Sequence, residues 1–126
     1  MSDDRFQTGL KTRRAVLGDA YVDKALASAN GADAPFQRFV TEGAWGSVWS
    51  RPHFDKRTRS IITISILAAL GRDEELALHV RATRNTGASA DDILELMMHV
   101  AVYAGVPAAN HALKIARRAL AEPHVP

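Results

Sequence analysis

Apolar residues in this 126-residue chain recur every three or four positions, and the two-residue alternation typical of surface strands is nearly absent. Residues with this spacing fall on one face of a helix, which can then pack against another helix. The pattern therefore predicts an all-α fold. Because a chain of this length buries roughly two-thirds of its unfolded surface, we expect one small domain of about six to seven helices over residues 1–126.

Glycines and capping residues mark where these helices should begin and end. Gly18, Gly71 and Gly87 each follow an apolar helical run and should end it. Asp19, Asp33 and the pair Ser89 and Asp92 should cap the helices that follow them. The expected helices cover residues 5–16, 20–29, 34–50, 55–70, 73–86, 90–104 and 107–121.

Composition narrows the class of protein. Hydrophobic residues make up 47% of the chain and charged residues 24%, as in ordinary globular domains. The net charge of +2 comes from interspersed acids and bases, so no nucleic-acid partner is expected. No apolar run approaches the roughly 20 residues that span a bilayer, and residues 1–5 lack an apolar signal region. We therefore expect a soluble cytoplasmic protein with no membrane partner.

Glu75 and His79 are the first candidate catalytic residues. They are four positions apart in the expected helix 73–86, so both side chains lie on one face. A carboxylate at this spacing can orient the imidazole and favour its protonated form, which suits a general acid. The same spacing is also found in exposed ion pairs, and a histidine among apolar neighbours can simply be a packed core residue.

A metal or thiol site is not expected. The chain has no cysteine, which excludes disulfides, thiolate nucleophiles and zinc–thiolate sites. Glu95 and His99 repeat the four-residue spacing on the next helix, but carboxylate-bridged di-iron bundles use a three-residue spacing and further glutamates. The plainer interpretation of His99 is a partly buried packing residue.

Four runs of sequence, in order and in spacing, resemble the carboxymuconolactone decarboxylase family. They are TEGAWGSVWSRP at 41–52, DKRTRS at 55–60, ELALHVR at 75–81 and YAGVPAAN at 103–110. The resemblance covers nearly the whole chain. It implies the small all-α fold of alkylhydroperoxidase-D-like proteins, assembled as a homo-oligomer, either a trimer or a hexamer.

The resemblance also separates two kinds of chemistry within that fold. The redox relatives carry Cys-x-x-Cys-x-x-x-His, and when His79 is placed on their histidine, Arg72 and Glu75 occupy the two cysteine positions. A thiol peroxidase needs both sulfurs. A cation and a carboxylate in their place favour binding an anion and moving a proton, as in the decarboxylase branch.

The resemblance implies a reaction in which 4-carboxymuconolactone loses carbon dioxide to give 3-oxoadipate enol-lactone, during bacterial breakdown of aromatic acids through protocatechuate. No cofactor is implied, because the lactone carbonyl can accept the electrons that the departing carboxylate leaves behind. We assign His79 as donor of the proton or of a hydrogen bond to the lactone oxygen, oriented by Glu75. Arg59 and Arg72 would clamp the substrate carboxylates, since a guanidinium binds a carboxylate at two points.

Further substrate-binding candidates come from the family motifs, and each has a structural alternative. They are Glu42, Trp45, Tyr103 and Asn110. Trp45, with Trp49, could instead anchor the core or a subunit interface, Tyr103 could pack, and Asn110 could cap the last helix. Arg59 could instead form an ion pair with Asp55 at the start of its helix.

Two other classes of function stay open at this point. A non-catalytic helical oligomer that binds a small aromatic-derived acid would keep the pocket and lose only the proton donor. A helix-turn-helix regulator would need a basic recognition helix, but the last helix is mostly alanine and apolar residues apart from Lys114, Arg117 and Arg118. An enzyme acting on a related lactone is a further alternative within the same class.

Overall fold

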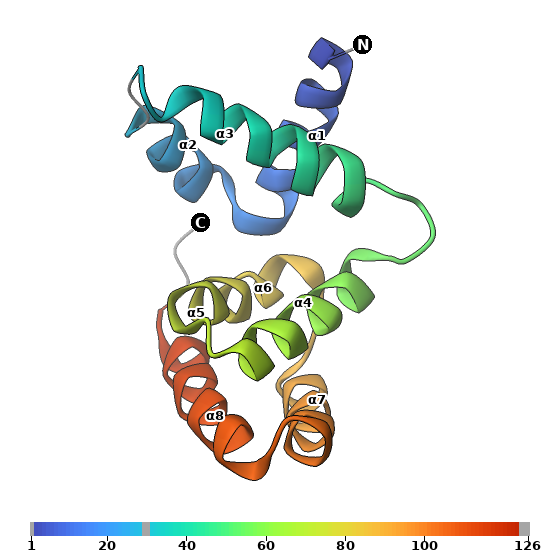
Figure 1. Cartoon of the computed structure of the whole chain (residues 1–126), viewed down its shortest axis with the longest axis vertical. Helices are drawn as coiled ribbons and strands as arrows, with labels where there is room; N and C mark the ends of the chain where they lie inside the picture. The colour runs from blue at the N-terminus through green and yellow to red at the C-terminus, as the bar shows by residue number, and fades with distance from the viewer. Residues whose placement is uncertain (1, 29–30, 124–126) are drawn as a thin grey trace. The chain divides into compact units, whose positions relative to one another are not determined.

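The computed structural model describes residues 2–28 and 31–123, and all regular secondary structure in these residues is helical. The all-α prediction is confirmed. The helices group into two compact units, one formed by the residues up to Asp55 and the other by those from Lys56 onward (Figure 1). The organisation of the chain as one domain stays a prediction, and each unit is described by itself.

The first unit contains three α-helices and one π-helix. They are α1 (Ser2–Leu17), α2 (Asp19–Ala27), α3 (Ala34–Val40) and the π-helix η1 (Thr41–Trp49). Two serine hydroxyls follow the wider π spacing, since Ser47 Oγ and Ser50 Oγ donate to carbonyls five residues earlier, at 3.0 and 2.6 Å. The predicted single helix over 34–50 is therefore α-helical only in its first half.

Two glycines let α1 and η1 pack backbone against backbone. A Cβ atom added at Gly9 would collide with the carbonyl oxygen of Thr41 and would lie 2.8 Å from the backbone nitrogen of Gly46. A Cβ atom at Gly46 would lie 2.7 Å from the carbonyl oxygen of Arg5. Beside this contact, Arg13 Nη1 donates to the hydroxyl of buried Thr41 at 3.2 Å. The first unit thus depends on close helix approach more than on large side chains.

The second unit is a bundle of α-helices. They are α4 (Lys56–Leu70), α5 (Asp73–Arg81), α6 (Thr83–Thr86), α7 (Ala90–Tyr103) and α8 (Val106–Ala121). Helix α4 packs against α5, α6, α7 and α8, and α8 lies beside α5 and α7 (Figure 1). Its apolar core includes Ile64, Leu76, Ile93 and Met97, all almost completely buried.

Helix α8 contributes alanines to this core. Ala109, Ala112, Ala116 and Ala119 recur at spacings of three and four and are all buried. A face without large side chains allows neighbouring helices to approach closely. The backbone of α8 can therefore lie close to its neighbours, whereas the other helices of this unit fill the core with larger side chains.

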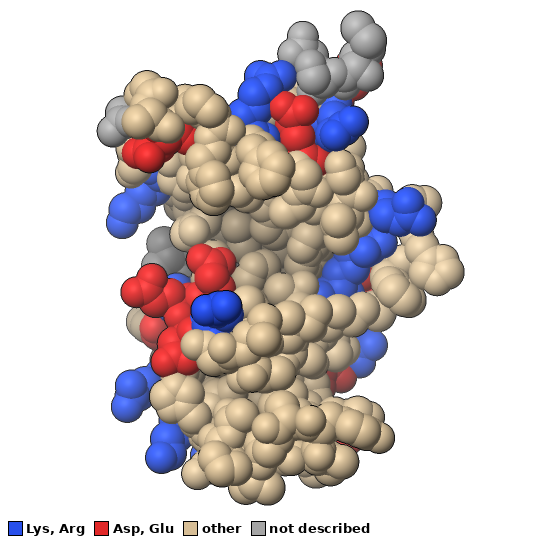
Figure 2. Space-filling view, in the orientation of Figure 1, with Lys and Arg blue, Asp and Glu red and all other residues tan. Residues whose placement is uncertain are grey.

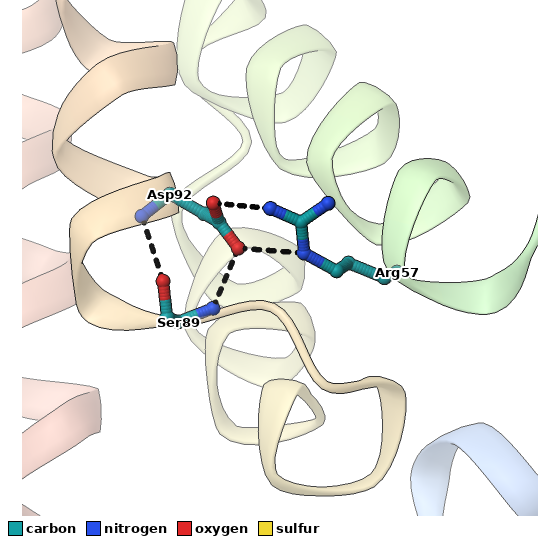
Figure 3. Close-up of polar contacts among 3 residues, drawn as sticks. All are labelled: Arg57, Ser89 and Asp92. Carbon is teal, nitrogen blue, oxygen red and sulfur yellow. Dashed lines mark hydrogen bonds and ion pairs between the residues drawn. The ribbon is translucent and has the colours of Figure 1, made fainter.

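The start of α7 carries the predicted capping box. Asp92 N donates to Ser89 Oγ at 3.0 Å, and Ser89 N donates to Asp92 Oδ2 at 2.9 Å (Figure 3). The carboxylate of Asp92 also accepts two hydrogen bonds from Arg57 on α4 (Figure 3). One acidic side chain thus caps α7 and links it to α4.

Each of the seven expected helices is present, but several details differ from the prediction. Asp19 does not cap α2: Gly18 holds the cap position, while Asp19 begins the helix and pairs with Arg14 at 3.2 Å. Asp33 holds the cap position of α3, but its side chain makes no capping hydrogen bond to the start of the helix. The expected helix 73–86 is divided at Ala82 into α5 and α6. The predicted end of the second helix, near residues 29 and 30, lies outside the described residues.

Two of the predicted helix ends are formed by glycines in the left-handed region. Gly71 follows α4 with φ of 70°, and Gly87 follows α6 with φ of 88°. Only glycine adopts this conformation without strain. None of the described helices is both long enough and apolar enough to cross a membrane.

Candidate active site in the second helical unit

Helix α5 places Glu75 and His79 one turn apart but in different environments. Glu75 lies in the first turn and is exposed, whereas His79 lies in the last turn with only 8% of its surface exposed. The acid near the N-terminus suits the helix dipole. The predicted pair on one face of α5 thus consists of a surface carboxylate and, one turn later, a buried imidazole.

Burial determines the charge of His79. Loss of contact with water lowers the pKa of its imidazole from 6.5 to about 4. This direction is opposite to the one the sequence predicts from Glu75, because the cause of the shift is the desolvation of the buried imidazole. At neutral pH His79 is therefore an uncharged side chain with one N–H to donate and one nitrogen to accept.

The two candidate arginines also differ in environment. Arg59 lies in the first turns of α4 with 8% of its surface exposed, and α4 packs against α5. Arg72 is exposed in the turn between α4 and α5, immediately before the first residue of α5. The structure thus provides one buried guanidinium in the same unit as buried His79, and a second guanidinium on the surface.

The other predicted substrate contacts are spread over both units. Glu42 lies in η1 of the first unit and pairs with Arg38 at 2.7 Å. Trp45, also in η1, is part of the core, and its ring stacks on that of Trp49 with centroids 5.0 Å apart. Its alternative role as a core residue is confirmed, while its role toward substrate, like that of Glu42, stays a prediction.

Tyr103 and Asn110 are surface residues of the second unit. Tyr103 is 85% exposed at the end of α7, so it is not a packing residue of the core, and its ring stacks on that of exposed His99. Asn110 is exposed inside α8, which begins at Val106 after the cap position of Gly105. The alternative role of Asn110 as a cap is wrong, because Gly105 holds the cap position and Asn110 lies within the helix.

Charged side chains form a separate groove between α5 and α8. It has a volume of about 390 Å³ and is lined by Asp73, Glu74, Ala77, His111, Ile115, Arg118, Ala119 and Glu122. His111 Nε2 lies 2.9 Å from Asp73 Oδ2 at its edge. Figure 2 shows acidic side chains gathered over α5, whose first turn holds Asp73, Glu74 and Glu75. By helical spacing, His79 lies on the flank of α5 away from Asp73 and Ala77.

The described part of the chain has no cluster of histidine and carboxylate side chains of the kind that binds a metal ion. Among residues 2–28 and 31–123, no group of three or more such side chains could hold a metal ion. His99, expected to be partly buried, is exposed instead.

Two buried hydroxyl groups near Arg59 and His79 were not singled out from the sequence. Ser60 follows Arg59 on α4, and Thr86 ends α6, seven residues after His79. Ser60 is 1% exposed and Thr86 8%. The sequence signals for Ser60 are its place in the run DKRTRS and its four-residue spacing to Ile64 and Ala68, which puts it on the inward face of α4.

The sequence of the chain matches a known family. The sequence pattern of the carboxymuconolactone decarboxylase family matches residues 34–118. The chain therefore belongs to the carboxymuconolactone decarboxylase family.

Two named decarboxylases align along most of the chain, and a third aligns along part of it. A 4-carboxymuconolactone decarboxylase of Acinetobacter baylyi is 44% identical over 117 residues, which cover 92% of this chain and 87% of the relative. The nitrosuccinic acid decarboxylase npaB of Metarhizium robertsii is 37% identical over 115 residues, covering 91% of this chain and 80% of the relative. A 4-carboxymuconolactone decarboxylase of Pseudomonas putida is 45% identical over 42 residues, covering 33% of this chain and 88% of that sequence.

Proposed function

We propose that the protein is a carboxy-lyase that converts 4-carboxymuconolactone to 3-oxoadipate enol-lactone, in aromatic acid breakdown through protocatechuate. The observation that carries this proposal is the 44% identity to the Acinetobacter baylyi 4-carboxymuconolactone decarboxylase over 92% of the chain. The buried cation and imidazole of the second unit, Arg59 and His79, support it chemically.

The substrate itself explains why the chain needs no electron-accepting cofactor. As the carboxylate leaves, its electron pair moves through the ring double bond into the lactone carbonyl and forms a dienolate. That dienolate then takes a proton on carbon. The protein must hold a dianion, stabilise the negative charge that develops on the lactone oxygen, and allow one proton to be delivered.

His79 suits the second of these tasks in its neutral form. A neutral imidazole N–H can donate a hydrogen bond to the lactone oxygen, and the bond strengthens as negative charge develops there. Such a donor does not have to be charged beforehand, so the lowered pKa is compatible with catalysis. We therefore assign His79 as the donor to the lactone oxygen, with Glu75 orienting the ring from the preceding turn.

Arg59 is our first choice for the carboxylate clamp because it is buried, where an ion pair is less screened by water. Arg72 is exposed and would attract or hold the second carboxylate near the surface. Glu42, Trp45, Tyr103 and Asn110 remain second-rank contacts, proposed from the family motifs.

A second substrate is favoured by one specific observation, the 37% identity to a nitrosuccinic acid decarboxylase. A nitro group on the carbon that loses carbon dioxide can accept the electron pair, as the lactone carbonyl does. Both compounds are dicarboxylic acids that carry an electron acceptor. Nitrosuccinic acid is therefore the first alternative substrate, and a non-catalytic binder of such acids is the alternative outside the enzyme class.

We also propose that the chain assembles as a homo-oligomer, a trimer or a hexamer. Leu94, Met98 and Val102 follow one another at four-residue spacing on α7 and are exposed, as is Val106 at the start of α8. Figure 2 shows an uncharged surface over the turn between α7 and α8. Apolar surface of this kind is typical of subunit interfaces. Light scattering of the wild type and of Met98→Glu tests this proposal, and equal masses would contradict it.

The catalytic proposal is tested by generating the carboxylated lactone enzymatically and following its conversion by the purified protein. Wild type should convert it without added metal or nucleotide, and His79→Ala should lose most of the turnover while remaining folded by circular dichroism. His111→Ala is the matched control, because His111 is exposed and belongs to the separate groove. No conversion by wild type refutes the substrate. Full conversion by His79→Ala refutes the assignment of His79.

A further inference from the structure

Helix α4 and the segment α5–α6 carry their buried polar residues near the same end of the core. On α4, Ser60 is buried on the same face as the core residues Ile64 and Ala68, one helical turn before Ile64. On the segment α5–α6, the buried polar residues His79 and Thr86 follow the core residue Leu76 along the chain. The turn at Gly71 joins α4 to α5, and α4 packs against both α5 and the following α6, so the chain returns along α4. The start of α4 therefore lies level with the end of α5 and with α6.

The hydroxyls of Ser60 and Thr86 differ from other hydroxyls on these helices. Neither Ser60 Oγ nor Thr86 Oγ1 has a hydrogen-bond partner among the described residues, although both are buried. By contrast, Ser65 Oγ donates to the carbonyl of Ile61 at 2.7 Å, and Thr83 Oγ1 donates to the carbonyl of Val80 at 2.6 Å.

A buried hydroxyl without a partner destabilises a folded protein, since it has lost its hydrogen bonds to water and gained none. Alanine at position 60 or valine at position 86 would fill similar space without this penalty. Two such hydroxyls at the same end of one core, on helices whose ends there also carry buried Arg59 and His79, are better explained by a bound molecule than by packing.

We propose that the hydroxyls of Ser60 and Thr86 bind the substrate, each donating a hydrogen bond to the carboxylate that Arg59 holds. The inference rests on the proposed function and extends it by two binding residues. A guanidinium provides in-plane donors on one side of a carboxylate, and each carboxylate oxygen keeps further acceptor positions for hydroxyl donors. Ser60 and Thr86 are thus binding residues, and His79 acts on the lactone oxygen.

The test compares Ser60→Ala and Thr86→Val with matched controls that remove hydroxyls already bonded to the backbone, Ser65→Ala and Thr83→Val. Ser60→Ala should raise KM for the lactone about tenfold, as expected for a lost hydrogen bond to a charged group. Its Tm without ligand should stay unchanged or rise. The controls should keep the wild-type KM, and Thr83→Val should lower Tm because the carbonyl of Val80 loses its donor.

Two outcomes would overturn the proposal. One is a KM within twofold of wild type for both Ser60→Ala and Thr86→Val. The other is a fall in Tm for Ser60→Ala as large as that for Thr83→Val, which would mean that the hydroxyl of Ser60 stabilises the fold.

A binding measurement separates this inference from the proposed function. Succinate is a dicarboxylate without an electron acceptor, so it can occupy the site without being decarboxylated. At high concentration it should raise the Tm of wild type more than that of Ser60→Ala, whether or not wild type converts the lactone. An inactive wild type with this difference refutes only the proposed substrate, and equal or absent shifts overturn the role of Ser60.

Discussion

Arg57 and Asp92 join the first turn of α4 to the first turn of α7 through a two-point ion pair. Arg57 Nη2 lies 2.6 Å from Asp92 Oδ1, and Arg57 Nε donates to Asp92 Oδ2 at 3.0 Å. The same carboxylate accepts the backbone N–H of Ser89 at 2.9 Å. The Ser89 N–H, with the Arg57 guanidinium, holds the pKa of Asp92 below its ordinary value. One side chain therefore stabilises both a helix start and a helix contact.

The first prediction follows from this double role. Ser89→Ala removes only the cap and should lower the free energy of unfolding by about 1 kcal/mol. Asp92→Ala removes the cap and the link to Arg57, so its midpoint in urea should fall further. Urea unfolding followed by circular dichroism measures both. Equal midpoints for the two variants would show that the ion pair with Arg57 adds nothing.

The second prediction concerns the close contact between α1 and η1. Gly9→Ala should destabilise the first unit by about 2 kcal/mol or more, because its Cβ would meet backbone atoms of Thr41 and Gly46 that cannot move aside cheaply. Gly43→Ala is the matched control. Gly43 lies in η1, the helix that Gly9 packs against, and a Cβ atom added there would meet no atom within 4 Å. This substitution should be neutral or slightly stabilising. Thermal unfolding distinguishes the two, and similar Tm values would contradict the glycine contact.

The third prediction is a loss of stability in mild acid caused by His79. The unfolded state binds a proton on this side chain below about pH 6.5, whereas the folded state resists protonation until about pH 4. Stability should therefore fall as pH drops between these values, by up to about 3 kcal/mol for this residue. His79→Gln should show a shallower fall in the free energy of unfolding between pH 7 and pH 4.5. A fall as steep as in wild type would mean that His79 is not buried in its neutral form.

The fourth prediction concerns the pH dependence of turnover. Because burial lowers the pKa of His79 to about 4, the side chain is neutral throughout the range above about pH 5. If neutral His79 donates to the lactone oxygen, kcat/KM should stay flat from about pH 5.5 to 8. A charged imidazolium acid with an ordinary pKa would instead give a tenfold loss per pH unit above about 6.5. A stopped assay across this range decides between the two.

The fifth prediction compares the two candidate arginines. Arg59→Lys keeps the charge but loses the two-point geometry, so it should raise KM for the lactone by about tenfold or more. Arg72→Lys should change KM less than threefold, since Arg72 is exposed and its charge acts through water. Steady-state kinetics provide the measurement. A larger effect at Arg72 than at Arg59 would place the carboxylate clamp at the surface.

Much of the fold could be predicted because its boundaries depend on local chemistry. Gly71 and Gly87 end their helices in left-handed conformations, and Ser89 with Asp92 forms the expected capping box. The π-helix η1 could not be predicted, since its hydrogen-bond spacing follows from how closely α1 packs against it. The break at Ala82 is invisible for a similar reason, as alanine is a good helix former.

The site was less predictable, because its chemistry depends on burial. Spacing alone puts Glu75 and His79 on one face, but it does not reveal that the imidazole is buried while the carboxylate is exposed. That difference reverses the expected direction of the pKa shift of His79. Ser60 lies in the run DKRTRS but was not assigned a role from it, and only its missing hydrogen-bond partner in the folded chain draws attention to it.

The alanine face of α8 also determines how the second unit can change during evolution. A larger side chain at Ala112 or Ala116 would push α8 away from its neighbours unless a facing residue became smaller at the same time. Single substitutions at these positions should therefore be removed by selection. Sequence drift in this helix should be confined to its outward positions, such as Lys114 and Arg117, which tolerate replacement one residue at a time.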